Sequence, residues 1–67
     1  MAIARITEIK SSSKKSFDDA IKIGIKRAAK TLENIKGAWI AEQDCVVDDG
    51  EITEYRVLLK VTFVLND

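Results

Sequence analysis

A chain of 67 residues has room for one domain with a small core, and we expect a single domain spanning residues 1–67. Eleven basic and eleven acidic side chains cancel, so no strong field attracts nucleic acid or an anionic lipid surface. Histidine is absent and Cys45 is the only cysteine, which excludes an intrachain disulfide and an ordinary zinc site.

No apolar run approaches the roughly 20 residues that a membrane-spanning helix needs, and residues 1–10 do not resemble a signal peptide. A single free thiol suits a reducing compartment, so we expect a cytoplasmic protein. Ordering this chain costs on the order of 100 kcal/mol, which a core of this size barely offsets. We therefore expect self-association to supply the missing burial.

The first predicted element is a strand over Ala2–Lys10, where apolar and polar residues alternate. Three serines then interrupt the pattern and offer hydroxyl groups that cap a following helix. Ser13 is the preferred cap. Ser16 is the alternative, because Asp19 follows it at the spacing of a capping box.

From Lys14 to about Glu33 the period changes to that of a helix, which we expect to end near Asn34–Gly37. One face carries the apolar stripe Phe17, Ala20, Ile21, Gly24, Ala28 and Leu32, with Ile25 at its margin. Ile23 lies off this stripe, and we interpret it as a contact between subunits, with simple exposure as the alternative.

Two further strands are predicted, Ala38–Val47 and Ile52–Leu65, joined by a hairpin at Asp48–Glu51 that contains Asp-Gly. In the last strand the helix-facing residues are Tyr55, Val57, Leu59, Val61, Phe63 and Leu65. The opposite face is mixed and carries Glu54, Arg56, Leu58, Lys60, Thr62 and Val64. The predicted class is α+β, with a β-α-β-β order and a three-stranded antiparallel sheet.

Nothing in the sequence indicates catalysis, because a nucleophilic triad or a His-based acid–base pair has no residues to form it. We expect that the protein is not an enzyme and that Cys45 is a packed residue rather than a reactive one.

Two features favour ligand binding. Trp39 offers an indole for stacking on a flat ligand, unless it is a core or interface aromatic. Acidic residues crowd the hairpin, which suits a hard cation only if several copies contribute ligands.

Five short motifs are spread along almost the entire chain. They are Ser12-Ser13 before the helix, Lys26-Arg27-Ala28 within it, Thr31-Leu32 near its end, Glu54-Tyr55-Arg56-Val57, and Val61-Thr62-Phe63-Val64-Leu65. Together they resemble the dodecin family. The resemblance implies a β-α-β-β subunit whose sheet wraps one helix, assembled with itself as a hollow homododecamer that binds and stores a small ligand.

Flavin-type dodecins hold riboflavin-like ligands between tryptophans of symmetry-related subunits, with a glutamine and often an arginine nearby. Here those three positions fall on Gly37, Arg56 and Asp44, so all three depart from the pattern. Trp39 lies two residues beyond the usual tryptophan, a displacement of about 6 to 7 Å along a strand. A riboflavin or FMN site in this chain would use Trp39 and Arg56, with Gln43 as a polar helper.

The stretch Glu42-Gln43-Asp44, followed by Val47-Asp48 and Tyr55-Arg56, is more similar to calcium-type dodecins. A calcium site would use Glu42, Asp44 or Asp48 from neighbouring subunits. We rank this calcium-type or flavin-free variant slightly ahead of flavin binding. A third hypothesis is a structural or protein-interaction oligomer, in which Lys22, Lys26 and Lys30 on the helix meet an acidic partner.

Overall fold

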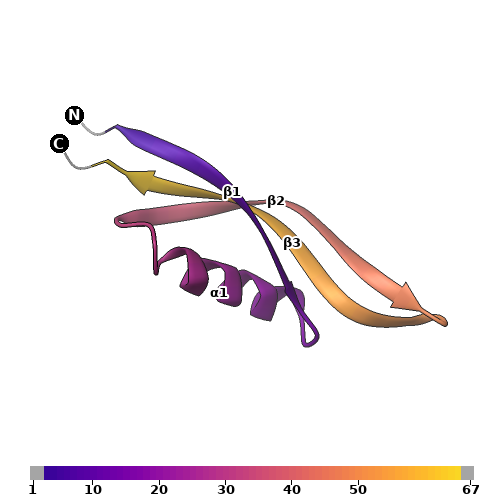
Figure 1. Cartoon of the computed structure of the whole chain (residues 1–67). Helices are drawn as coiled ribbons and strands as arrows, with labels where there is room; N and C mark the ends of the chain where they lie inside the picture. Colours follow the sequence, from indigo (N-terminus) through magenta and orange to yellow (C-terminus); the bar gives the residue numbers. More distant parts are fainter. Residues whose placement is uncertain (1–2, 66–67) are drawn as a thin grey trace.

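One helix lies across a three-stranded sheet in the computed structural model, which describes residues 3–65 (Figure 1). The elements are β1 (Ala4–Ser13), α1 (Phe17–Ala28), β2 (Ile35–Asp48) and β3 (Glu51–Val64). The sheet order is β1-β3-β2 and both strand pairs are antiparallel, which confirms the predicted β-α-β-β fold. Among the described residues, no helix is both long and apolar enough to cross a membrane.

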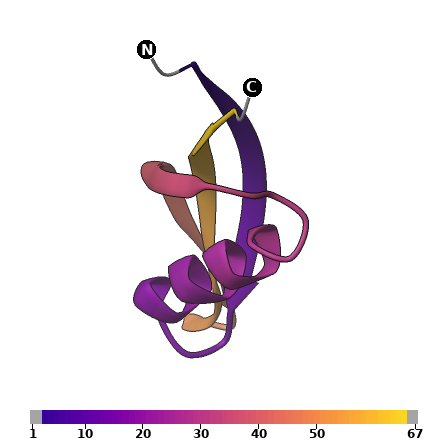
Figure 2. The same ribbon diagram turned by 90° about the vertical axis from the view of Figure 1, so that its left-hand side faces the viewer.

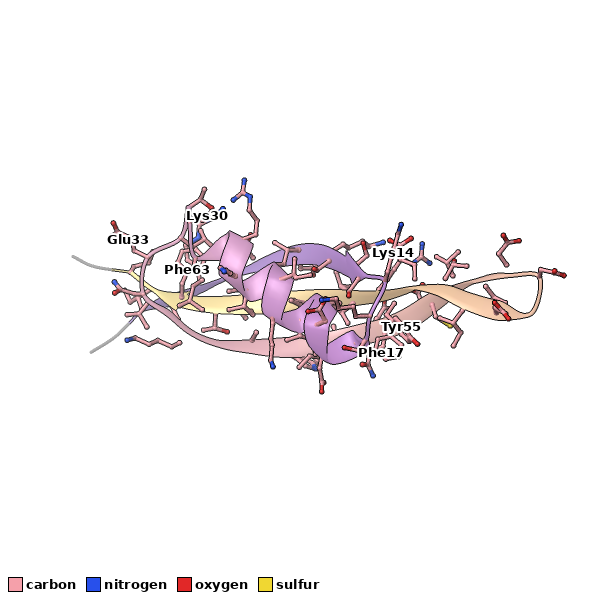
Figure 3. All side chains as sticks on the ribbon, turned by 90° about the horizontal axis from the view of Figure 1, so that it is seen from below. Lys14, Phe17, Lys30, Glu33, Tyr55 and Phe63 are labelled. Carbon is pink, nitrogen blue, oxygen red and sulfur yellow. The ribbon has the colours of Figure 1, made fainter. Side chains whose placement is uncertain are left out.

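The helix α1 covers only one face of the sheet (Figure 2). The core lies on that face, between α1 and the central strand β3. Leu59 and Val61 are fully buried and Val57 is almost so, as their predicted helix-facing positions require. At the start of the helix, Phe17 and Tyr55 meet edge to face with ring centroids 5.1 Å apart (Figure 3). Past this contact the β2–β3 hairpin extends beyond the helix (Figure 1). Much of the sheet is therefore left uncovered by the helix.

Gly24 allows α1 to approach the sheet closely. A Cβ atom at this position would lie 2.9 Å from Leu59 Cδ1 and 3.0 Å from Ser11 Cβ. Contacts that short force a neighbour to move, and Leu59 is fully buried. An internal glycine destabilises a helix by roughly 0.5–1 kcal/mol relative to alanine. Here it also permits the close packing of α1 on the sheet, which a larger residue would prevent.

The first strand is shifted from its predicted range, since it begins at Ala4, after Ile3, and continues three residues beyond Lys10. The three serines at 11–13 continue β1 and pair with Val57, Arg56 and Tyr55 of β3. Their propensity for turns is overridden because β3 presents backbone partners along its whole length. Ala2, where the predicted strand begins, lies outside the described residues.

Ser16, not the preferred Ser13, is the N-cap of α1. The Ser16 hydroxyl accepts a hydrogen bond from the Asp19 amide at 3.0 Å. Ser13 is buried, accepts a bond from the Lys15 amide at 2.9 Å and donates one to the Asp19 carboxylate at 2.5 Å. The prediction of Ser13 as the cap was wrong because this residue ends β1, four positions before the first helical residue, Phe17.

The helix is also shorter than predicted, since Lys14 and Lys15 precede it and it ends at Ala28. Its apolar stripe is confirmed: Ala20, Gly24 and Ala28 are buried, and Phe17, Ile21, Ile25 and Leu32 pack against the core. Asn34 adopts the left-handed conformation with φ 61°, and its side-chain amide donates to the Val64 carbonyl. Gly37 instead belongs to β2.

The hairpin has the predicted position and chemistry. Asp49 and Gly50 have φ values of 51° and 79°, the two positive angles of a type I′ turn. Both flanking strands differ from their predicted ranges. β2 begins three residues earlier and ends one later, while β3 begins and ends one residue earlier. The type I′ turn supports pairing up to its own edge, so the strands extend to Asp48 and Glu51.

We expect Ser16→Ala to lower the free energy of unfolding by about 1 kcal/mol, because the Asp19 amide loses its acceptor. Urea denaturation followed by circular dichroism measures this loss. Ser12→Ala, an exposed serine in β1, is the matched control and should change stability by less than about 0.5 kcal/mol. Equal losses in the two variants would contradict the assignment of Ser16 as the cap.

Candidate functional site

A β-bulge decides which side chains share the uncovered face of the sheet. Ile40 pairs with Leu59 and Glu42 pairs with Leu58, so Ala41 has no partner in the register. Strict alternation along β2 would place Trp39 on the same face as Gln43. The extra residue shifts the alternation, and Trp39 shares its face with Glu42 and Asp44 instead.

The uncovered face therefore carries three consecutive cross-strand rows, since directly opposed residues point to the same side. From β1 through β3 to β2, these rows are Glu8–Lys60–Trp39, Lys10–Leu58–Glu42 and Ser12–Arg56–Asp44. The first row ends in a tryptophan that is 63% exposed. We call these nine residues the outer-face site.

Arg56 and Asp44 form a two-pronged ion pair at one end of the outer-face site. Arg56 Nε donates to Asp44 Oδ1 at 2.8 Å, and Arg56 Nη2 donates to Oδ2 at 2.7 Å. The hydrogen bonds from Arg56 hold the pKa of the Asp44 carboxyl below its usual value, and the carboxylate raises the pKa of the guanidinium. Both groups are thus charged at neutral pH, and each Asp44 carboxylate oxygen accepts one hydrogen bond from Arg56.

An open groove of about 530 Å³ lies over the second and third rows. Its lining consists of Lys10, Ser11, Ser12, Glu42, Gln43, Asp44, Arg56, Val57 and Leu58. This volume is in the range of small-molecule sites, which combine apolar surface with a few placed polar groups. Leu58 supplies the apolar surface here, and the flanking charged residues supply the polar groups.

The structure brings some of the predicted ligand-binding residues together and separates others. Trp39 and Arg56 share the outer face, with one row between them. Gln43 borders the groove, but it pairs with Val57, so its side chain alternates towards the helix side of the sheet.

The three predicted cation ligands do not converge within one subunit. Glu42 and Asp44 share a face, whereas Asp48 lies four residues further along β2, about 13 Å away at the usual strand rise. Within residues 3–65, no group of three acidic or cysteine side chains is positioned to hold a metal ion. A calcium site built from these residues requires more than one copy of the chain.

The sequence did not predict the contacts that Lys60 makes with Trp39 and Glu8. The Lys60 ammonium group lies 4.7 Å from the centroid of the Trp39 ring and 3.9 Å from Glu8 Oε1. Alternation placed Lys60 on the correct face, but the contact with Trp39 depends on the register between β2 and β3. The sequence alone therefore does not reveal that Lys60 lies opposite Trp39, because the register between the two strands must be known first.

The fold is a small β-α-β-β domain, and the outer-face site lies on the exposed face of its sheet. The dodecin family model matches residues 3–66, and this chain belongs to the dodecin family. The curated calcium dodecin of Mycobacterium tuberculosis is 30% identical over 63 residues, which cover 94% of this chain and 89% of that protein.

Solved structures agree with this assignment. The dodecin from Streptomyces davaonensis is 35% identical, with a TM-score of 0.93 over 98% of this chain and 97% of that one. The calcium dodecin structure from Mycobacterium tuberculosis is 31% identical, with a TM-score of 0.82 over 96% and 91% of the two chains. This chain is thus similar to dodecins throughout its length, including one that is named for calcium.

Proposed function

We propose that this protein assembles with itself as a hollow homododecamer in the cytoplasm and that the assembly binds and stores a small ligand without acting as an enzyme. The exposed apolar surface of one subunit supports assembly, because so many large apolar side chains are seldom left in water. These residues are Ile3, Ile6, Ile23, Trp39, Ile40, Val47, Ile52 and Leu65. Ile23 at 47% exposed remains our candidate for a contact between subunits.

The favoured ligand is a flat aromatic molecule of the flavin class, riboflavin or FMN. The observation that carries this proposal is the 63% exposed indole of Trp39 on the same face as Arg56 and the groove. A tryptophan ring in such a position stacks on a flat heterocycle, and Arg56 contributes directional hydrogen bonds. This order reverses the ranking from sequence alone, because Asp44 is engaged by Arg56 and no three acidic side chains of residues 3–65 come together.

The proposed mechanism of storage is enclosure by stacking and polar contacts. Each bound ring would exchange water for the indole face and for the apolar surface near Leu58. The proposed role is binding alone, so the ligand leaves chemically unchanged.

Titration of the purified oligomer with riboflavin and with FMN tests the proposed ligand. Stacking on an indole quenches flavin fluorescence, so we expect saturable quenching by the wild-type protein. Unquenched fluorescence of both compounds at protein concentrations of tens of micromolar would contradict flavin binding and favour the cation hypothesis.

Calcium is the second candidate, favoured by the 30% identity to calcium dodecin and by Glu42 and Asp44 on one face. In this case a Ca²⁺ ion bound by several subunits must compete with Arg56 for the Asp44 carboxylate. We then expect Ca²⁺ to raise the melting temperature, and to raise it more in Arg56→Gln, which frees Asp44.

Asp44→Asn and Glu42→Gln would abolish this calcium-dependent shift if they remove ligands, and Asp48→Asn tests the third predicted ligand. Mg²⁺ at equal concentration is the control. It has the same charge and gives the same ionic strength, but its stricter coordination geometry disfavours a site that suits Ca²⁺. A shift that is unchanged in all three variants would exclude these carboxylates as calcium ligands.

A further inference from the structure

Trp39 is held from one side by a residue that the flavin hypothesis does not use. Lys60 is its directly opposed neighbour on β3, and the ammonium group lies over the indole ring at 4.7 Å from the centroid. A lysine ammonium is attracted to the face of an aromatic ring, and tryptophan is the strongest partner for this interaction. One of the two indole faces is therefore covered within the subunit.

Lys60 is itself restrained from its other side. Glu8, the opposed residue on β1, places Oε1 3.9 Å from the Lys60 ammonium. The Lys60 side chain is 32% exposed, against 59% for Glu8 and 63% for Trp39 as a residue. The first row of the outer-face site is thus a chain of contacts across all three strands, with the lysine as its most sheltered member.

We propose that Lys60 is a positioning residue that closes one face of Trp39, so that a flat aromatic ligand stacks on the opposite face only. This inference rests on the proposed function for its ligand. Lys60 restricts the indole to one orientation before the ligand arrives, which lowers the ordering cost of binding. Glu8 contributes by holding the ammonium group in place.

The covering of Trp39 is measurable without any ligand, because this is the only tryptophan in the chain. Acrylamide quenching of the Trp39 fluorescence should rise in Lys60→Ala, because the indole face that the lysine side chain shielded becomes open. In Lys60→Arg the quenching should equal that of wild type, since a guanidinium also stacks on an indole. Lys22→Ala, which truncates an exposed helix lysine, is the matched control.

Riboflavin binding provides the second test. Lys60→Met should weaken binding about two- to five-fold, the equivalent of one exposed cation–π contact, and Lys60→Arg should restore it. Glu8→Gln should weaken binding in the wild-type background but have no further effect in Lys60→Met, because its action passes through the lysine. Unchanged or tighter binding by Lys60→Met would overturn the proposal, since Lys60 would then be neutral or obstructive.

These two tests separate the failure of the inference from the failure of the proposed function. If the wild-type protein binds no riboflavin, the proposed ligand is wrong, and acrylamide quenching still decides whether Lys60 covers the ring. If riboflavin binds wild type and Lys60→Met equally, and acrylamide quenches wild type and Lys60→Ala equally, the role of Lys60 alone is refuted.

Discussion

Leu59→Ala should lower the free energy of unfolding by about 2–5 kcal/mol, the loss expected when a fully buried leucine is truncated. Leu59 is completely buried and lies against Gly24 of the helix, where the backbone cannot collapse easily into a cavity. For a chain with so small a core, this loss is a large part of its total stability. Chemical denaturation at constant protein concentration measures it.

Leu58→Ala is the matched control, because the same residue type one position away points to the outer face. Leu58 is only partly buried in the subunit, so we expect a smaller loss than in Leu59→Ala. A larger loss in Leu58→Ala would show that the outer face carries more of the stabilising burial than the helix side does. That result would contradict the position of the core described above.

Trp39→Ala should weaken riboflavin binding about 5- to 150-fold, because stacking of a flat heterocycle on an aromatic side chain contributes about 1–3 kcal/mol. The indole is 63% exposed, so its removal should leave the fold intact. Fluorescence titration of riboflavin measures the affinity, and circular dichroism confirms the fold.

Trp39→Phe keeps an aromatic ring and should retain much of the affinity lost in Trp39→Ala. Phe63→Leu is a second control, because this ring lies on the helix side of the sheet and should leave riboflavin affinity unchanged. Equal binding by wild type and Trp39→Ala would remove Trp39 from the site and leave the flavin proposal without its main observation.

Much of the fold follows from local patterns in the sequence. The alternation of Val57, Leu59 and Val61 identifies the buried side of the central strand, and the Asp49-Gly50 turn identifies the hairpin. Element ends are less predictable. The serines at 11–13 look like a loop, yet they pair with β3, because the available backbone partners outweigh their intrinsic preference.

The sequence proposes candidate residues for the site but not their arrangement in space. The structure places Trp39 and Arg56 on one face and Gln43 on the other, because the bulge at Ala41 shifts the alternation along β2. A bulge has no reliable signature in one sequence, and it reverses the facing of every residue beyond it. The ion pair of Asp44 with Arg56 and the contact of Lys60 with Trp39 both depend on the resulting register.

The mass of the purified protein in solution, measured by sedimentation equilibrium, tests the central claim most directly. Twelve copies of a 7.5 kDa chain form a particle of about 90 kDa, and we predict this mass at micromolar concentrations. A stable monomer or dimer would contradict the hollow storage assembly, and would favour a structural or protein-interaction role in which Lys22, Lys26 and Lys30 meet an acidic partner.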